Sequence, residues 1–118
     1  MRVGVVGSRQ LNVKDIIYAT LDLVFKDINP SECIIVTGGC KGPDSIALEY
    51  ASDKQMKTVL HLPDWSRYGR AAGPIRNELI VQGSDLIVAF WDGKSKGTLS
   101  SINIAKRLDK PVIIIDCN

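Results

Sequence analysis

At 118 residues, with 45% hydrophobic and 24% charged residues, the chain has the length and composition of one globular domain that needs no disulfide or structural metal. Its formal net charge of +2 is too small to indicate nucleic-acid or membrane binding from the overall balance, so any basic character must be local. No apolar stretch resembles a signal peptide or a transmembrane helix, and we therefore expect a cytoplasmic protein with no membrane partner.

Apolar runs of strand length recur along the chain. They cover residues 2–6, 33–37, 57–61, 85–90 and 111–115. Their apolar residues are nearly continuous rather than alternating, which is typical of parallel strands whose sheet is covered by helices on both faces.

Segments with helical periodicity separate these runs. We expect helices at about residues 13–24, 44–53, 74–81 and 98–108, with a long loop over residues 62–73. Pro43 and Pro74 each follow a glycine and are expected in the first turn of a helix. Right-handed crossovers then predict one α/β domain over residues 1–118, a three-layer Rossmann-like sandwich with a five-stranded parallel sheet in the order 3-2-1-4-5.

Glycine-rich and polar turns follow the first, second and fourth strands, and in this sheet they meet at one crevice. Glycine amides and helix starts can bind anions there, although the same glycines can also serve only to make tight turns. The candidate ligand residues in these turns are Gly7, Ser8, Arg9, Gly38, Gly39, Lys41, Gly42, Asp44, Trp91, Asp92, Ser95, Lys96, Gly97 and Thr98.

Each group has an expected role. Arg9, Lys41 and the amides of the turns at 38–39 and 97–98 would bind phosphate, and Thr98 is expected to open the last helix. Asp44 would accept hydrogen bonds from ribose hydroxyls, or it only stabilises the helix dipole. Cys40 either fills a tight turn, the simpler interpretation, or carries a reactive thiol.

The loop over residues 62–73 and the helix start after it interleave arginines with aromatic residues. Its candidate ligand residues are Asp64, Trp65, Arg70, Arg76 and Asn77. Trp65 and Trp91 could stack on a base, and the arginines could bind phosphate, whereas the alternative for each aromatic residue is that it packs the loop onto the domain. Together they favour a base-containing ligand.

These motifs, in this order, resemble those of the SLOG superfamily, and in particular its small bacterial and phage branch of stand-alone domains. The motifs that carry the resemblance are G-S-R at 7–9, T-G-G at 37–39, K-G-P-D at 41–44, D-W at 64–65, G-P-I-R-N at 73–77, F-W-D-G at 90–93 and S-K-G-T at 95–98. The resemblance implies a Rossmann-like domain that binds nucleotides or nucleotide-derived molecules. Its relatives include phosphoribohydrolases, ligand-sensing domains and a DNA-processing protein that binds single strands.

One departure bears on activity. The phosphoribohydrolase motif P-G-G-x-G-T-x-x-E has a glutamate where this chain has Ser101, so a hydrolase would need Asp44 or Asp92 as its acidic group. We therefore expect first a binding domain for a nucleotide or nucleotide-derived molecule, used for sensing or sequestration. A phosphoribohydrolase-like hydrolase is the first alternative, and single-stranded nucleic-acid binding is the second.

The remaining expectations concern partners and ions. No cofactor is required by the motifs and no metal cluster is visible, but Mg²⁺ could accompany a phosphate ligand and use Asp44 or Asp92. Leu23 and Phe25 are expected to lie off the core-facing stripe of the first helix, where they could pair the subunits of a homodimer.

Overall fold

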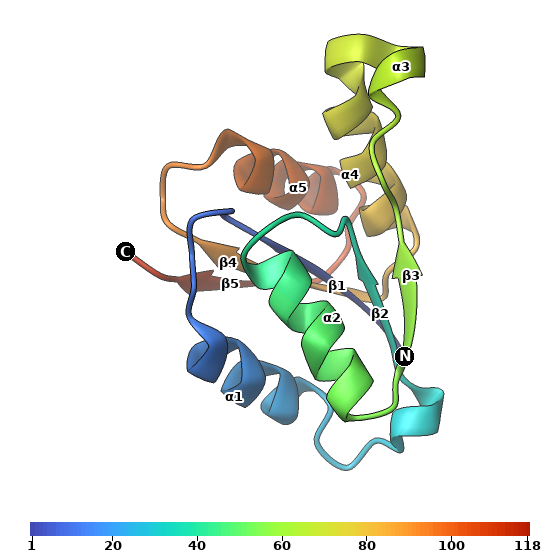
Figure 1. Ribbon diagram of the computed structural model, residues 1–118, viewed down its shortest axis with the longest axis vertical. Coiled ribbons are helices and arrows are strands. Elements are labelled where there is room, and N and C mark those ends of the chain that lie inside the picture. Colours follow the sequence, from blue (N-terminus) through green and yellow to red (C-terminus); the bar gives the residue numbers. More distant parts are fainter.

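A five-stranded parallel sheet forms the centre of the computed structural model, which describes residues 1–118 (Figure 1). The strands are β1 (Arg2–Gly7), β2 (Ile34–Thr37), β3 (Lys57–Leu60), β4 (Leu86–Trp91) and β5 (Val112–Asp116). Every neighbouring pair is parallel, and the order is β3-β2-β1-β4-β5. The predicted Rossmann-like α/β fold and sheet order are confirmed, with strand ends that differ from prediction by no more than one residue.

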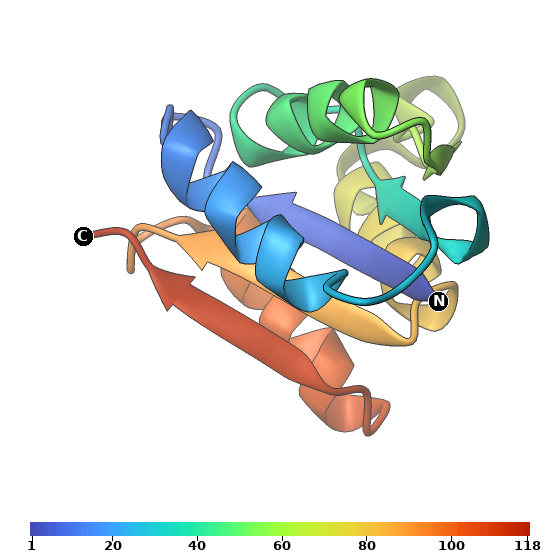
Figure 2. The ribbon, with the colours of Figure 1, turned by 90° about the horizontal axis from the view of Figure 1, so that it is seen from below.

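Helices cover both faces of the sheet and complete three layers (Figure 2). One face carries α1 (Lys14–Val24) and α2 (Pro43–Asp53), and the other carries α4 (Ala72–Gln82) and α5 (Lys96–Arg107). Each face has its own buried apolar cluster, with Ile17 and Tyr50 in the first and Ile80 and Ile102 in the second. The central strands β1 and β4 are buried on both sides, which explains why their apolar runs are continuous.

The segment expected as a long loop contains two short helices instead. They are α3 (Trp65–Tyr68) and the 3-10 turn η2 (Gly69–Ala71), and together with Asp64 they form an arm that projects beyond the sheet (Figure 1). The Asp64 carboxylate begins α3 by accepting the backbone N–H of Arg67 at 3.1 Å. A further 3-10 turn, η1 (Pro30–Glu32), precedes β2.

Two sequence expectations about helices are wrong. The last helix begins at Lys96 rather than at Thr98, because the Ser95 hydroxyl caps it by accepting the Thr98 N–H at 3.4 Å. Phe25 does not contribute to an exposed apolar face, since it is buried and stacks on Tyr50 with ring centroids 6.3 Å apart. Leu23 alone of that expected surface is exposed, at 74%.

None of the helices combines the length and the apolar character that crossing a membrane requires. The longest of them, α5, has 12 residues and carries Lys96, Lys106 and Arg107.

Candidate functional site

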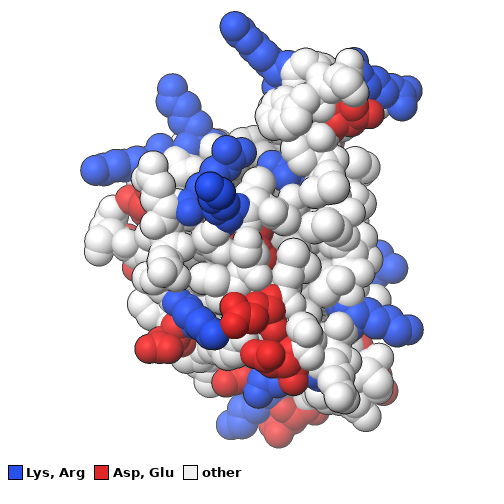
Figure 3. Space-filling view, viewed as in Figure 1, with Lys and Arg blue, Asp and Glu red and all other residues white.

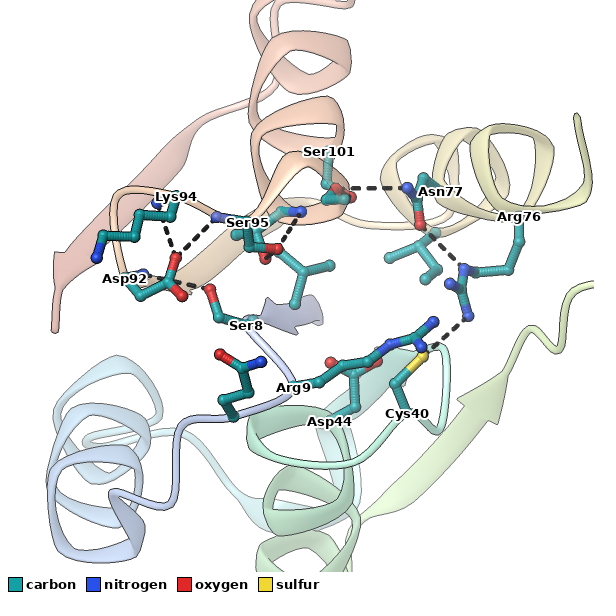
Figure 4. Close-up of a pocket in the computed structure, with 16 residues that line it drawn as sticks. Ser8, Arg9, Cys40, Asp44, Arg76, Asn77, Asp92, Lys94, Ser95 and Ser101 are labelled. Atoms are coloured by element: carbon teal, nitrogen blue, oxygen red, sulfur yellow. Dashed lines mark hydrogen bonds between the residues drawn. The ribbon is translucent and has the colours of Figure 1, made fainter. Parts of the chain in front are cut away.

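A crevice of about 410 Å³ opens at the carboxyl edge of the sheet, where the loops after β1, β2 and β4 meet α4 and α5 (Figure 4). Its lining is mostly polar. The lining residues are Val6, Gly7, Ser8, Arg9, Gln10, Cys40, Asp44, Arg76, Asn77, Ile80, Asp92, Lys94, Ser95, Gly97, Thr98 and Ser101.

The structure brings part of the predicted set together at this crevice. The predicted residues that line it are Gly7, Ser8, Arg9, Asp44, Arg76, Asn77, Asp92, Ser95, Gly97 and Thr98. The predicted residues that do not line it are Gly38, Gly39, Lys41, Gly42, Asp64, Trp65, Arg70, Trp91 and Lys96. The crevice is therefore formed by the loops that the sequence indicated, and ten of the nineteen predicted residues line it.

Sequence reasoning left six lining residues out of the ligand set: Val6, Gln10, Cys40, Ile80, Lys94 and Ser101. Helical spacing offered a signal for two of them, because Ile80 follows Arg76 by four residues and Ser101 follows Gly97 by four. The others are neighbours of predicted residues, and only the folded loop decides which of them face the crevice.

Arg76 is a charged residue of the site that is buried without forming an ion pair. Its side chain is only 8% exposed, yet it takes part in none of the ion pairs of the chain. Its Nε donates to Asn77 Oδ1 at 2.9 Å, and its Nη1 donates to Gly38 O at 3.2 Å and to Cys40 Sγ at 3.6 Å. Nη2 has no hydrogen-bond partner in the protein. The guanidinium is therefore buried at the crevice without a direct ion pair, although the Asp44 carboxylate lies near enough for the two charges to interact.

Gly38 makes room for this guanidinium. A Cβ at position 38 would lie 2.3 Å from Arg76 Nη1 and 2.9 Å from its Cζ. A larger residue at position 38 would therefore force the guanidinium to move from its present place. The backbone N–H of Gly38, which the sequence suggested for phosphate binding, is bonded to another group of the protein.

That group is Asp44, whose carboxylate accepts the Gly38 N–H at 3.2 Å. Asp44 is 5% exposed, and this burial raises its pKa to about 6, although hydrogen bonds from Thr37, Gly38 and Cys40 and the charge of Arg76 act in the opposite direction. Asp44 can therefore hold or release a proton near neutral pH, and the Gly38 N–H is not free for a ligand.

The pKa of Asp92 is shifted in the opposite direction from that of Asp44. Its Oδ1 accepts the N–H groups of Ser95 and Lys94 at 2.8 Å each, and these hydrogen bonds lower the pKa of its carboxyl group. Its own N–H donates to Ser8 Oγ at 3.2 Å, which ties the loop after β4 to the loop after β1. Asp92 thus stays ionised and shapes the loop that leads into α5.

The start of α5 adds hydrogen-bond donors to the crevice. The first amides of a helix have no acceptor within the helix, and the first turn of α5 contains Gly97 and Thr98, which line the crevice. Asn77 Nδ2 donates to Gly97 O at 3.5 Å and so connects α4 to this turn. An anion in the crevice would lie between this helix start and the Arg76 guanidinium.

The aromatic residues predicted to stack on a base lie elsewhere. Trp91 donates from Nε1 to Ser95 O at 3.0 Å and packs against the second apolar cluster. Trp65 lies on the arm and is 54% exposed, and Arg70 and Asp64 also belong to the arm. Neither tryptophan lines the crevice.

Basic side chains gather around this end of the molecule. Figure 3 shows Lys and Arg over the carboxyl edge of the sheet and over the arm, whereas Asp and Glu concentrate over α1 and α2. The exposed cations in the crevice loops and the arm are Arg9, Lys41, Arg67, Arg70, Lys94 and Lys96. Cations therefore outnumber carboxylates around the crevice, whose lining contains Arg9, Arg76 and Lys94 against Asp44 and Asp92. No group of three or more His, Cys, Asp or Glu residues is arranged to hold a metal ion.

The pKa of Asp44 leads to a stability prediction. Because the pKa rises from 3.8 to about 6 on folding, the folded state holds the proton more tightly than the unfolded chain. The protonated Asp44 therefore makes its full contribution to the free energy of unfolding below about pH 4. As the pH rises through about 6, the free energy of unfolding falls by about 3 kcal/mol. Asp44→Asn should therefore raise Tm relative to the native chain at about pH 8, and this gain should shrink steadily towards about pH 4.

Melting curves of both proteins across this pH range test the prediction. Asp15→Asn, at an exposed position in the first turn of α1, is the matched control and should show a difference in Tm that changes little with pH. A difference in Tm between Asp44→Asn and the native chain that does not change with pH would contradict a raised pKa of Asp44.

The fold and the site together define a Rossmann-like domain with a basic crevice at the carboxyl edge of its sheet. The chain belongs to the YAcAr family, described as the YspA, cpYpsA-related SLOG family, whose model matches residues 1–68. It is 32% identical over 119 residues to the Gene 61 protein of Mycobacterium phage D29, a match that covers 95% of this chain and 94% of that protein.

Solved structures with lower identity support the fold. DNA processing protein A from Helicobacter pylori, described for its single-stranded DNA binding mode, matches with a TM-score of 0.77 and 21% identity over 100% of this chain and 66% of that one. The Moco carrier protein from Chlamydomonas reinhardtii matches with a TM-score of 0.64 and 19% identity over 97% of this chain and 75% of that one.

Proposed function

We propose that this protein binds a phosphate-bearing nucleotide or nucleotide-derived molecule in the crevice, and that it serves as a sensing or sequestering domain. The observation that carries the proposal is Arg76, a nine-tenths buried guanidinium that forms no direct ion pair and whose Nη2 has no hydrogen-bond partner in the protein. An anionic ligand would accept a charge-assisted hydrogen bond from this free Nη2 group.

The surroundings of Arg76 fit a phosphate group. The backbone N–H of Gly97, in the first turn of α5, has no acceptor within the protein, and Arg9 and Lys94 add positive charge at the rim. The phosphate site of this proposal differs from the one expected from sequence, because the amide of Gly38 already binds Asp44. Membership of a SLOG family supports the choice of a nucleotide-derived ligand over a simple anion.

Native mass spectrometry of the purified protein, followed by denaturation and identification of any released molecule, is the first test. Isothermal titration calorimetry with AMP, ADP, cyclic mononucleotides and inorganic phosphate then compares affinities. We expect at least one nucleotide to bind more tightly than inorganic phosphate. Equal affinities for nucleotides and inorganic phosphate would show that the base and ribose do not contribute to binding. The absence of any binding would overturn the proposal.

If the ligand carries Mg²⁺, Asp92 fits the ion better than Asp44, because its carboxylate stays ionised. No resident cofactor is part of the proposal. A homodimer that pairs through α1 could use the exposed Leu23 but not the buried Phe25. Light scattering at several protein concentrations would detect such a dimer.

Single-stranded nucleic-acid binding is a second candidate, and the arm formed by Asp64, α3 and η2 favours it. The arm carries two exposed arginines, Arg67 and Arg70, and two exposed aromatic side chains, Trp65 and Tyr68. Arginines and stacking aromatics are the usual contacts to single strands. The structural match to a DNA processing protein agrees with this candidate in fold only.

Replacement of Trp65 and Arg70 by alanine is the corresponding prediction. The double variant should bind an oligothymidylate about tenfold more weakly, since a lost base stack costs roughly 1–3 kcal/mol, while its affinity for AMP should not change. Fluorescence anisotropy at several salt concentrations measures the first quantity. Arg107→Ala, which removes a cation of α5 paired with Glu78, is the control. Equal weakening in both variants would count against a role for the arm.

Hydrolysis of the bound nucleotide is the other candidate, and Asp44 favours it. A carboxyl group with a pKa of about 6 in a crevice can give and take a proton near neutral pH, whereas the ionised Asp92 cannot act as an acid. Ser101 lines the crevice but has no ionisable carboxylate to offer. Release of a free base from a panel of nucleoside monophosphates would support this candidate, and tight binding without turnover would contradict it.

A further inference from the structure

The edge strand β5 leaves one row of its backbone groups without partners in the sheet. Its odd-numbered residues face β4, since Pro111 O accepts the Ile87 N–H at 2.9 Å at one end of the strand. The Cys117 N–H donates to Trp91 O at 2.9 Å at the other end. Backbone groups alternate in direction along a strand, so the even-numbered residues point theirs away from the sheet. These residues are Val112, Ile114 and Asp116.

The side chains of β5 make this open edge apolar. Val112 packs against the second apolar cluster and Ile115 against the first, so the strand presents alternate residues to the two faces of the sheet. Ile113 is 39% exposed and Ile114 is 41% exposed, one on each face. Proteins commonly protect an open edge with a lysine, a proline or a bulge, and residues 112–115 contain none of these. The edge is therefore suited to pair with another strand.

We propose that β5 is the surface through which two copies of this chain associate, with the two β5 strands antiparallel about a two-fold axis at Ile113. The two five-stranded sheets then form one continuous sheet of ten strands. The carboxyl edges of the two sheets lie at opposite ends of this assembly. Each crevice therefore stays open to solvent, and the proposal does not depend on what the crevice binds.

The free backbone groups and the apolar side chains agree with this axis. Only even-numbered residues have free N–H and C=O groups, so hydrogen-bonded pairs across the interface must join even-numbered residues. With the axis at Ile113, Val112 lies opposite Ile114 of the partner subunit, and the reverse pair completes four hydrogen bonds. The two copies of Ile113 face each other as a non-hydrogen-bonded pair, in which the side chains are closest.

Charge complementarity selects the same register. Lys110, two residues before the strand, lies opposite Asp116 of the partner subunit, and the two-fold axis repeats this pair. Neither residue forms an ion pair within its own chain. An axis at Ile114 would instead place Val112 opposite the partner's Asp116, and an axis at Val112 would place Lys110 opposite the partner's Ile114. Only the axis at Ile113 pairs apolar with apolar residues and cation with anion.

Helix α1 adds apolar surface on the same side of the molecule. It faces α2 through Tyr18, whose hydroxyl donates to Asp53, and it faces the sheet through the buried Ile17. Its third side points away from α2 and carries Ile16 and Leu23, both exposed and seven residues apart. Figure 2 shows α1 on the side of α2 that is nearer to β5. A two-fold axis at β5 therefore brings these exposed sides of the two α1 helices towards each other.

Sedimentation velocity of the full chain at increasing concentration tests the dimer. We expect a species of twice the chain mass in the native protein and its loss in Ile113→Lys, which places two ammonium groups opposite each other at the axis. Thr58→Lys is the matched control, because it adds the same charge at an exposed, outward-pointing position of the other edge strand, β3, and should still dimerise. A native protein that stays monomeric would overturn the proposal, as would equal dimerisation of Ile113→Lys.

A charge exchange tests the register with variants that leave the apolar edge intact. Lys110→Glu alone and Asp116→Lys alone each place like charges opposite one another twice, and each should raise the dimer Kd about tenfold. The double variant restores opposite charges and should return the Kd to within about threefold of the native value. Circular dichroism establishes that every variant is folded. A double variant that dimerises as weakly as the single variants, or more weakly, would overturn the placement of the axis at Ile113.

Discussion

Arg76→Gln is expected to weaken the binding of a phosphate-bearing ligand by about a hundredfold. A hydrogen bond to a charged group contributes roughly 1.5–3 kcal/mol, and about 2.7 kcal/mol corresponds to a factor of one hundred in Kd. Glutamine is shorter and neutral, so it supplies neither the charge nor the planar fork of the guanidinium. Calorimetric titration of AMP into the native protein and the variant measures the change.

Arg107→Gln is the matched control, because it makes the same chemical change on the surface, where Arg107 pairs with Glu78 at 3.0 Å. Its affinity for AMP should stay within about twofold of the native value. The Arg76 variant loses the hydrogen bonds to Asn77 Oδ1 and Gly38 O but breaks no ion pair, and circular dichroism together with a melting curve establishes that it is folded before affinities are compared. Equal affinities of the native protein and Arg76→Gln for AMP would contradict the role of Arg76 in phosphate binding, on which the proposed function depends.

The fold could be predicted because local signals agreed with one another. Continuous apolar runs identified buried parallel strands, and Pro43, which follows Gly42, marks the first residue of α2 as expected. The arm was missed because α3 has only four residues, too few for a helical period to be recognised. The start of α5 was misplaced because Ser95 and Thr98 are both good capping residues, and only the observed hydrogen bond distinguishes them.

The site could be predicted only to the level of its loops. Sequence order and sheet topology bring the turns after β1, β2 and β4 to one edge, and this part is visible in the pattern of strands. The use of the Gly38 amide by Asp44 and the contact of Gly38 with Arg76 depend on tertiary packing. Residues 38 and 76 are far apart in sequence, so no local pattern could reveal that the absence of a side chain at Gly38 leaves room for the Arg76 guanidinium.

A related contact explains Gly7, which sequence reasoning assigned to ligand binding. A Cβ at this position would lie 2.4 Å from Cγ and 2.5 Å from Cβ of Pro43, and 3.0 Å from the carbonyl oxygen of Phe90. The proline ring is rigid and begins α2, while the Phe90 carbonyl accepts the N–H of Ser8 at 3.0 Å. Neither neighbour can move without disturbing the sheet edge that carries the crevice.

Gly7→Ala is therefore expected to lower the free energy of unfolding by about 3 kcal/mol, the cost of overpacking against rigid neighbours, and to lower Tm by roughly 10 °C. Gly97→Ala is the matched control, because no atom lies within 4 Å of a Cβ at that position and alanine favours the helix. Its stability should be unchanged or slightly higher in the absence of ligand. Urea unfolding of both variants measures the difference, and equal losses would show that the contact with Pro43 is not the reason for a glycine at position 7.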